Sequence, residues 1–176
     1  ILVHGLWTGA WAMQGLRLLL SRRGYAATAL DYPSMAQSLL DNARRRALRV
    51  AELRRPAVHL VGHSLGGLVI LRYLRTCGEQ RIGRVVLLGA PVRGCMAGLR
   101  LESLAAGERL LGASRDIWRS LPDDYRPQCE LGVIAGGRPW GLGHLVMRLP
   151  GTNDGVVRLE ETEVAGMRDR IVLPVS

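Results

Sequence analysis

Apolar residues along the chain form short continuous runs that alternate with longer, amphipathic segments. Such runs, bounded by Gly or Pro, are typical of strands buried on both faces, and the longer segments are typical of helices that cover a sheet. The predicted strands span residues 1–5, 25–32, 57–63, 84–89, 130–137 and 170–176. The predicted helices span residues 11–23, 37–55, 65–77 and 99–111. This alternation predicts an α/β fold with a mostly parallel, doubly wound sheet and helices on both faces.

The alternation breaks between residues 92 and 129, where several glycines surround one short predicted helix. An insertion there would lie above the end of the preceding strand, where a small lid could cover a site. Its apolar residues could line a pocket or pack the helix on the sheet, and the sequence leaves both open. They are Met96, Leu99, Leu101, Leu104, Leu110, Leu111, Ile117 and Trp118. We interpret residues 1–176 as a single domain with a lid-like insertion over residues 92–129.

A serine stands at the corner between the third predicted strand and the helix that follows it. The stretch VHLVGHSLGGLV over residues 58–69 joins the two through a one-residue turn at Ser64. Gly62 and Gly66 lack side chains at the two positions that such a turn brings together. A Gly-x-Ser-x-Gly match arises by chance in roughly one chain in eight of this composition, so the flanking apolar strand and helix carry the interpretation.

Four motifs follow one another along the chain: HGLW (residues 4–7), GHSLGG (62–67), LGAP (88–91) and NDGVV (153–157). In this order they resemble the bacterial lipase and esterase branch of the α/β-hydrolase superfamily, over residues 1–176. The resemblance implies an α/β-hydrolase fold and a Ser–Asp–His triad acting on esters, with Ser64 as nucleophile and Asp154 as acid. It implies a small-molecule ester or lipid substrate, and no metal, organic cofactor or obligate protein partner.

The first strand leads into a His-Gly loop, ILVHGLW over residues 1–7. In serine hydrolases such a loop supplies one backbone N–H of the oxyanion hole, and after His-Gly the donor is the next residue. We therefore expect the N–H groups of Leu6 and Leu65 to bind the oxyanion together. The alternative is that His4 and Gly5 simply end a strand.

Asp154 is also the acid that chain order selects, because the triad acid of this fold lies in a loop after a strand downstream of the serine. Residues 130–137 form such a strand, and Asp154 lies in the loop beyond it. The later acidic residues Glu160, Glu161, Glu163 and Asp169 lie among polar residues and are predicted to be solvated. The alternative for Asn-Asp-Gly is an ordinary turn without catalytic meaning.

The base of the triad has no candidate in the expected place. The histidines are His4, His59, His63 and His144, and none follows Asp154. His4 and His63 belong to the two oxyanion segments, His59 is expected to be a satisfied core residue, and use of His144 would reverse the usual chain order. By resemblance, the catalytic histidine follows the last strand. We therefore expect that the sequence is truncated and that the base lies within a few residues after Ser176.

All 24 basic residues are arginine, and the formal net charge is +9. Aromatic residues make up only 5% of the chain and are not interleaved with the arginines, so nucleic-acid binding is not expected. The charge is compatible with a weak peripheral attraction to anionic lipid surfaces. The three cysteines fit no zinc-binding spacing, and no apolar run is long enough to predict a transmembrane segment. The chain is expected to be soluble, and the sequence leaves a cytoplasmic or an exported location open.

The expected activity is ester hydrolysis through an acyl-enzyme on Ser64. Thioester cleavage, amide cleavage and acyl transfer to an alcohol use the same groups and remain open. A further alternative is a non-catalytic binding protein of the same fold that has lost its base. What the gene encodes after Ser176 separates these readings, because a histidine there favours the enzyme and a stop codon favours the binding protein.

Overall fold

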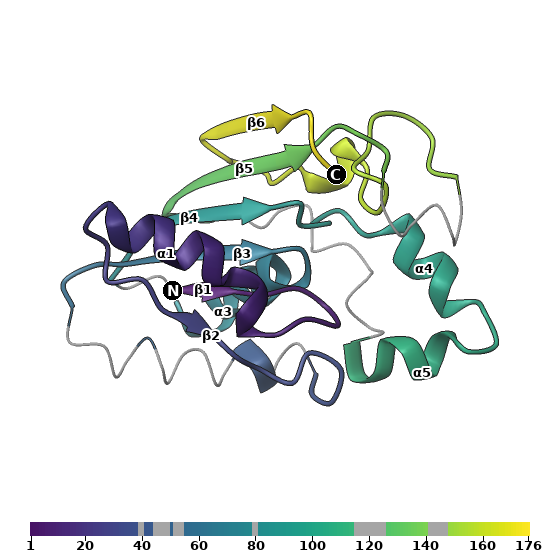
Figure 1. Ribbon diagram of the computed structural model, residues 1–176, viewed down its shortest axis with the longest axis horizontal. Helices are drawn as coiled ribbons and strands as arrows, with labels where there is room; N and C mark the ends of the chain where they lie inside the picture. Colours follow the sequence, from purple (N-terminus) through teal and green to yellow (C-terminus); the bar gives the residue numbers. More distant parts are fainter. Residues whose placement is uncertain (39–40, 44–49, 51–54, 79–80, 115–125, 141–147) are drawn as a thin grey trace.

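A six-stranded parallel sheet forms the centre of the protein (Figure 1). The computed structural model of the chain describes residues 1–38, 41–43, 50, 55–78, 81–114, 126–140 and 148–176. The strands are β1 (Leu2–Val3), β2 (Ala29–Leu30), β3 (Val58–His63), β4 (Ile82–Leu88), β5 (Glu130–Gly136) and β6 (Asp169–Leu173). Their order is β2-β1-β3-β4-β5-β6, and every neighbouring pair is parallel. The chain therefore winds outward from β1 in both directions, which is the doubly wound topology that the sequence predicts.

Helices cover both faces of this sheet. In Figure 1 the short helix η1 (Ala10–Met13) and α1 (Gln14–Arg22) lie in front of the strands, and α3 (Leu65–Cys77) lies behind them. Nine of the thirteen residues of α3 are buried, and its bounds coincide with the helix predicted over residues 65–77. By contrast α1 has no buried residue. No helix in the described parts of the chain is both long and apolar enough to cross a bilayer.

The main core lies between α3 and the middle of the sheet. Its strands are apolar on both faces because helices can cover both sides, which explains the continuous hydrophobic runs. The side chains of Leu71 on α3 and Leu87 on β4 are completely buried. The other core members from these elements include Val3, Leu60, Leu68, Val69, Val85, Leu131 and Val133.

Two predicted elements differ from the structure. The strand predicted over residues 25–32 is reduced to β2, because the chain reaches the sheet edge only at Ala29. The helix predicted over residues 99–111 is two helices, α4 (Met96–Glu102) and α5 (Gly107–Leu111). The chain doubles back between them so tightly that a Cβ on Gly107 would lie 2.0 Å from the Leu101 carbonyl oxygen. Of the helix predicted over residues 37–55, residues 41–43 are helical and most of the rest lies outside the described residues.

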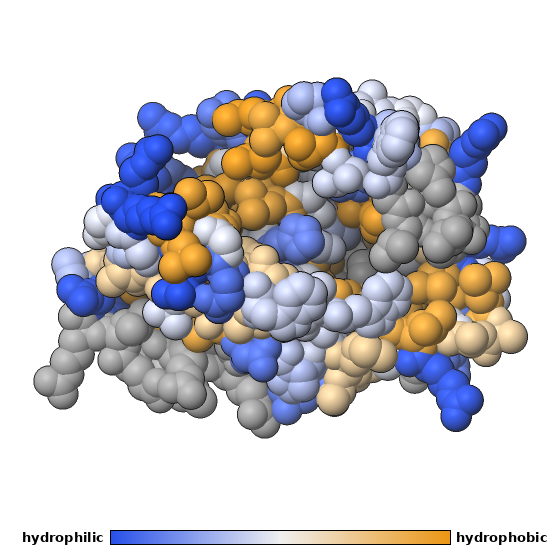
Figure 2. All heavy atoms as spheres, viewed as in Figure 1, coloured by the Kyte–Doolittle hydropathy of each residue, from blue (hydrophilic) through white to orange (hydrophobic). Residues whose placement is uncertain are grey.

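The described part of the predicted insertion lies beyond the carboxyl ends of the strands, where Figure 1 shows α4 and α5. A second small core holds it together, formed by Cys95, Ala97, Leu101, Leu111 and Leu149. Three further leucines (Leu99, Leu104 and Leu110) are exposed, and apolar side chains gather over this end of the molecule in Figure 2. The predicted apolar residues therefore divide between packing and surface, while Ile117 and Trp118 lie outside the described residues.

We expect Leu71→Ala to lower the free energy of unfolding by about 2–5 kcal/mol, because truncating a fully buried leucine loses apolar burial and leaves a cavity. The matched control is Leu19→Ala on α1, where the leucine is 59% exposed and the change should cost less than about 0.5 kcal/mol. Urea unfolding followed by circular dichroism measures both. Equal losses in the two variants would contradict the packing of α3 described above.

Candidate active site

Ser64 occupies the corner between β3 and α3. Its backbone has φ 50° and ψ −119°, in a region that residues with side chains rarely adopt. Its N–H donates a hydrogen bond of 2.8 Å to the carbonyl of Leu88 at the end of β4, and its carbonyl accepts one of 2.9 Å from the N–H of Gly67. The corner is thus tied both to the neighbouring strand and to the helix that it starts.

Gly62 and Gly66 have a direct steric role at this corner. A Cβ on Gly62 would lie 2.6 Å from the Cα of Gly67, and one on Gly66 would lie 2.3 Å from the carbonyl oxygen of Val3. Both distances are shorter than carbon atoms tolerate, and both obstacles are backbone atoms that cannot rotate away. Only glycine therefore allows the start of α3 to approach β1 and β3 this closely.

The loop after β1 lies against the Ser64 corner. A Cβ on Gly5 would lie 3.2 Å from the Cβ of Ser64, so the Gly5–Leu6 backbone passes directly beside the serine side chain. Within the described residues, no hydrogen bond uses the N–H of Leu6. Leu65 is the first residue of α3, where a helix N–H has no partner four residues earlier. Two backbone donors without a partner in the described part of the chain, those of Leu6 and Leu65, therefore flank Ser64.

Trp7 anchors this loop to the insertion, a contact that no sequence motif indicates. Its indole Nε1 donates a hydrogen bond of 2.7 Å to the carbonyl of Leu110 on α5. Its φ of 57° is unusual for a residue with a large side chain. The loop beside Ser64 is thus held from the insertion side as well as by β1.

Asp154 lies above the ends of β4 and β5. A Cβ on Gly136 would lie 2.7 Å from its Cβ, and one on Gly89 would lie 3.3 Å from its Oδ2. Its Oδ1 accepts hydrogen bonds from the N–H groups of Val156 (2.8 Å) and Val157 (2.7 Å), so the residue does form the turn of the alternative interpretation. Its Oδ2 has no hydrogen bond within the described residues and remains available for another donor.

The buried side chain of Asn153 stiffens the same turn. Its amide nitrogen donates a hydrogen bond of 2.7 Å to the carbonyl of Gly151, and its Oδ1 accepts one of 2.9 Å from the N–H of Gly155. Asn153 and Asp154 therefore fix successive parts of the loop with their side chains, as Asx turns do.

His63 lies next to Ser64 in the chain and is close enough to Asp154 for the carboxylate to affect its pKa. It precedes Ser64 at the end of β3, and part of its ring remains exposed. Partial desolvation lowers the pKa of His63, the Asp154 carboxylate opposes this shift, and His4 adds to it. In the described part of the chain, His63 makes no hydrogen bond to Ser64 or Asp154.

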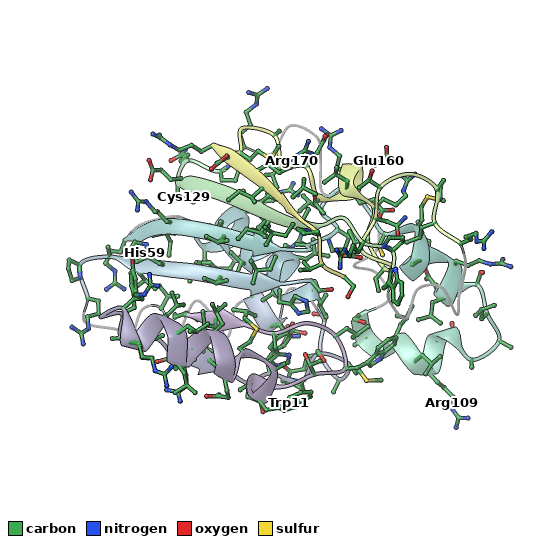
Figure 3. The ribbon with its side chains drawn as sticks, turned by 45° about the horizontal axis from the view of Figure 1, so that its top comes forward. Trp11, His59, Arg109, Cys129, Glu160 and Arg170 are labelled. Carbon is green, nitrogen blue, oxygen red and sulfur yellow. The ribbon has the colours of Figure 1, made fainter. Side chains whose placement is uncertain are left out.

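The remaining histidines do not supply a base among the described residues. His4 is completely buried and its Nε2 accepts the N–H of Tyr32. His59 lies at the amino end of β3, far from the corner (Figure 3). Its Nδ1 accepts the N–H of Arg84, so it is satisfied as predicted. It is exposed rather than part of the core, because it lies on the face of β3 opposite to the buried Val58 and Leu60. His144 lies outside the described residues.

Glu161 corrects a prediction, since it is only 3% exposed rather than solvated. Its two carboxylate oxygens accept the N–H of Met96, at the start of α4, and the N–H of Arg158, each at 2.8 Å. It thereby joins the loop that carries Asp154 to the base of the insertion. The bond to Arg158 is half of a capping box at η4 (Leu159–Thr162), but the N-cap is an arginine, so the usual Ser/Thr-x-x-Glu signal that could have identified Glu161 is absent from the sequence.

The site thus combines a hydroxyl on a tight corner, two unused backbone N–H groups and a carboxylate at one edge of the sheet. Open parallel sheets bind their ligands at this edge, outside the carboxyl ends of the strands. Such groups suit attack on a carbonyl with stabilisation of the resulting oxyanion. No cluster of three or more potential metal ligands occurs within the described residues.

Comparisons with known proteins identify the family and the fold. The profile of the family described as "Alpha/beta hydrolase family" matches residues 1–170. No curated protein sequence matches the chain. Among solved structures, the mature form of Bacillus licheniformis lipase BlEst2 superposes with a TM-score of 0.79 at 19% identity, covering 96% of this chain and 80% of that one.

Two further structures are similar. Paleococcus ferrophilus monoacylglycerol lipase has a TM-score of 0.64 at 20% identity, covering 98% of this chain and 82% of that one. Legionella pneumophila phospholipase PlaB has a TM-score of 0.68 at 16% identity, covering 93% of this chain. The chain spans only 45% of PlaB, and 44% of the propeptide form of BlEst2. At these identities the likeness establishes a shared α/β-hydrolase fold.

We expect Gly66→Ala to displace the start of α3 or to lower the free energy of unfolding by about 1–3 kcal/mol or more, because the new methyl group would overlap backbone carbonyls of β1. The control is Gly15→Ala on α1, where a Cβ meets nothing within 4 Å and should be neutral or stabilising by about 0.4–1 kcal/mol. Urea unfolding of both variants tests the comparison. An undiminished stability of Gly66→Ala would contradict the close approach at this corner.

Proposed function

The chain belongs to the alpha/beta hydrolase family, and we propose that it is a serine ester hydrolase of the lipase and carboxylesterase type. The observation that carries this proposal is the placement of Ser64 on its strained corner, between the unused N–H groups of Leu6 and Leu65. A serine that serves only as a helix cap needs neither the left-handed backbone nor a glycine loop packed against its side chain. A nucleophile that must be reached by a substrate benefits from both.

The reaction then proceeds in two halves. Ser64 Oγ attacks the ester carbonyl while a base accepts its proton, and the carbonyl oxygen becomes an oxyanion held by Leu6 and Leu65. Collapse of this intermediate expels the alcohol, which takes the proton from the base and leaves an acyl group on Ser64. The same base then takes a proton from a water molecule, whose oxygen attacks the acyl carbon; the bond to Ser64 Oγ breaks, the acid leaves, and the base returns the proton to Oγ. Each oxyanion donor contributes about 3–4 kcal/mol to lowering the barrier.

Asp154 is proposed to orient the base and to stabilise its protonated form. The two N–H groups that bind Oδ1 fix the plane of the carboxylate, so Oδ2 keeps one direction relative to the ends of β4 and β5. A carboxylate with one oxygen fixed and the other available suits a partner that donates from an imidazole Nδ1.

The base itself is proposed to be a histidine carried by residues beyond Ser176. This placement is supported by the path of the chain after β6. A Cβ on Gly136 would lie 2.6 Å from the Val175 carbonyl oxygen and 2.7 Å from the Asp154 Cβ, so Val175 passes beside the acid. A histidine a few residues further along the chain could therefore place its imidazole ring between Asp154 and Ser64.

The substrate is proposed to be an ester with an apolar acyl group, including lipid esters. Exposed leucines of α4 and α5 lie beyond the strand ends where such a group would enter, and the similar structures are named as lipases or a phospholipase. The net charge of +9 favours a weak association with anionic lipid surfaces that present the substrate. The same residues also suit thioester cleavage or acyl transfer to an alcohol.

In the full-length gene product, we expect Ser64→Ala to abolish hydrolysis of p-nitrophenyl butyrate, because no acyl-enzyme can form. Asp154→Asn should lower kcat by up to ~10⁴-fold, since the amide favours the wrong histidine tautomer. The control is Glu160→Gln, because this side chain is 65% exposed and pairs with Arg158. A damaging Glu160→Gln together with a near-silent Asp154→Asn would overturn the assignment of the acid, while full activity of Ser64→Ala would overturn the serine mechanism.

We expect residues 1–176 expressed alone to react slowly with a fluorophosphonate probe, because no described imidazole is bonded to Ser64 and its hydroxyl keeps its proton. The full-length protein should be labelled rapidly and stoichiometrically at Ser64, as measured by intact-mass spectrometry. Rapid labelling of the shorter chain would place the base within it, at His144 or His63. Absence of labelling in the full-length protein would instead favour a binding protein without catalytic activity.

A further inference from the structure

Two side chains of its own loop lie within hydrogen-bond distance of the carbonyl oxygen of Gly5. His4 Nδ1 lies 2.8 Å from it, and the hydroxyl of Thr8 donates to it over 3.1 Å. The two side-chain atoms are themselves 3.4 Å apart. This concentration of donors on one peptide oxygen is notable because the same peptide carries the N–H of Leu6.

The bonding around His4 defines which ring nitrogen carries the proton. Its Nε2 accepts the backbone N–H of Tyr32 over 3.3 Å, and a backbone N–H can only donate. Nε2 must therefore present a lone pair, which leaves the proton on Nδ1, where it faces the Gly5 carbonyl. Asp31 Oδ1 also lies 3.4 Å from Nε2, but it accepts the N–H of Ala10, and a proton on Nε2 would point at the Tyr32 N–H.

Tyr32 holds the His4 ring in this orientation from two directions. The two rings stack with their centres 4.3 Å apart, and the Tyr32 hydroxyl donates a hydrogen bond of 2.8 Å to the His4 carbonyl. His4 is completely buried, so water does not compete for its nitrogens. The donor that faces Gly5 is therefore fixed by packing as well as by hydrogen bonds.

We infer that His4, as the neutral tautomer protonated at Nδ1, and Thr8 are positioning residues that set the plane of the Gly5–Leu6 peptide and so aim the oxyanion donor. A trans peptide is planar, with its N–H directed opposite to its C=O. Because His4 and Thr8 hold the carbonyl on their side, the Leu6 N–H points to the other side, and it has no partner among the described residues.

This inference rests on the proposed function for its catalytic consequence, but not for the tautomer. An oxyanion hole is effective because its donors are already aimed before charge develops. Loss of one of the two bonds on the Gly5 carbonyl would give the Gly5–Leu6 peptide more rotational freedom. Stabilisation of the transition state would then weaken, while binding of the uncharged ester would not. The effect belongs to kcat rather than to KM.

The tautomer is tested by ¹⁵N NMR of the protein labelled at histidine, with the His4 ring assigned through bonds to its backbone. Near neutral pH we expect a protonated Nδ1 and an unprotonated Nε2. A proton on Nε2, or on both nitrogens with Asp31 as partner, would overturn the inference. This measurement decides the point even if the protein hydrolyses no ester, so its failure is distinct from failure of the proposed function.

The catalytic consequence is tested in the full-length protein with p-nitrophenyl butyrate. Thr8→Val should lower kcat by about 3–10-fold with KM unchanged within about twofold, a smaller effect than loss of a whole oxyanion donor. Thr8→Ser keeps the hydroxyl and should retain kcat. Thr76→Val is the matched control, because Thr76 makes the same kind of bond, of 2.8 Å to the Arg72 carbonyl, on the exposed side of α3.

Two outcomes would overturn the role of Thr8 in an active enzyme. One is a Thr8→Val variant with unchanged kcat or with only a raised KM. The other is a Thr8→Ser variant as impaired as Thr8→Val, which would indicate a packing effect of the methyl group instead of the hydroxyl. Absence of hydrolysis and of Ser64 labelling in the unmodified protein would count against the proposed function, and the His4 spectrum would still decide the inference.

Discussion

The close approach of backbone to backbone at the Ser64 corner is the constraint on which the rest of the site depends. The Cα of Gly66 stands where any side chain would meet the carbonyl oxygens of Val3 and His4 at 2.3 and 2.5 Å. Only this contact lets α3 begin immediately behind β1, and it is what brings the Leu65 N–H and the Gly5–Leu6 peptide to the same side chain. The left-handed backbone of Ser64 costs about 1–3 kcal/mol, which the extensive burial of α3 offsets.

The same device recurs along the carboxyl edge of the sheet. Gly5 after β1, Gly89 after β4 and Gly136 at the end of β5 each leave space that a site atom occupies, namely the Ser64 Cβ, the Asp154 Oδ2 and the Asp154 Cβ. Neighbouring strands of a parallel sheet lie about 5 Å apart. The Gly5–Leu6 peptide, Ser64 and Asp154 can therefore come together only if the residues at the strand ends have small side chains or none. The positions of these glycines therefore indicate where the site lies, as the positions of its polar residues do.

The sequence was sufficient for the parts of the structure that depend on local patterns. The parallel sheet follows from continuous apolar runs, and α3 follows from the Gly-Ser-Gly corner and an apolar helix, so Ser64 could be placed without coordinates. The break between α4 and α5 could not, because it depends on Gly107 packing against Leu101 after the chain has doubled back. The prediction that Glu161 is solvated was wrong for the same reason, because its partner, the N–H of Met96, lies 65 residues earlier in the chain.

The loop that carries the Leu6 N–H is held from two independent sides, and this shapes how its parts should respond to change. His4 and Thr8 fix its carbonyl from the sheet side, while the Trp7 indole fixes the next residue to Leu110 of α5. The first attachment is internal to one loop and is insulated by burial. The second crosses to the insertion, so any displacement of α5 would pull on Trp7 while the Gly5 carbonyl stayed in place. The backbone dihedral angles of Leu6 and Trp7 would then take up most of the change. The φ of Trp7, at 57°, already lies outside the usual range. The proposed oxyanion donor is therefore held on the sheet side by hydrogen bonds within its own loop and on the other side by a contact with α5, so a movement of α5 would reach this donor through Trp7.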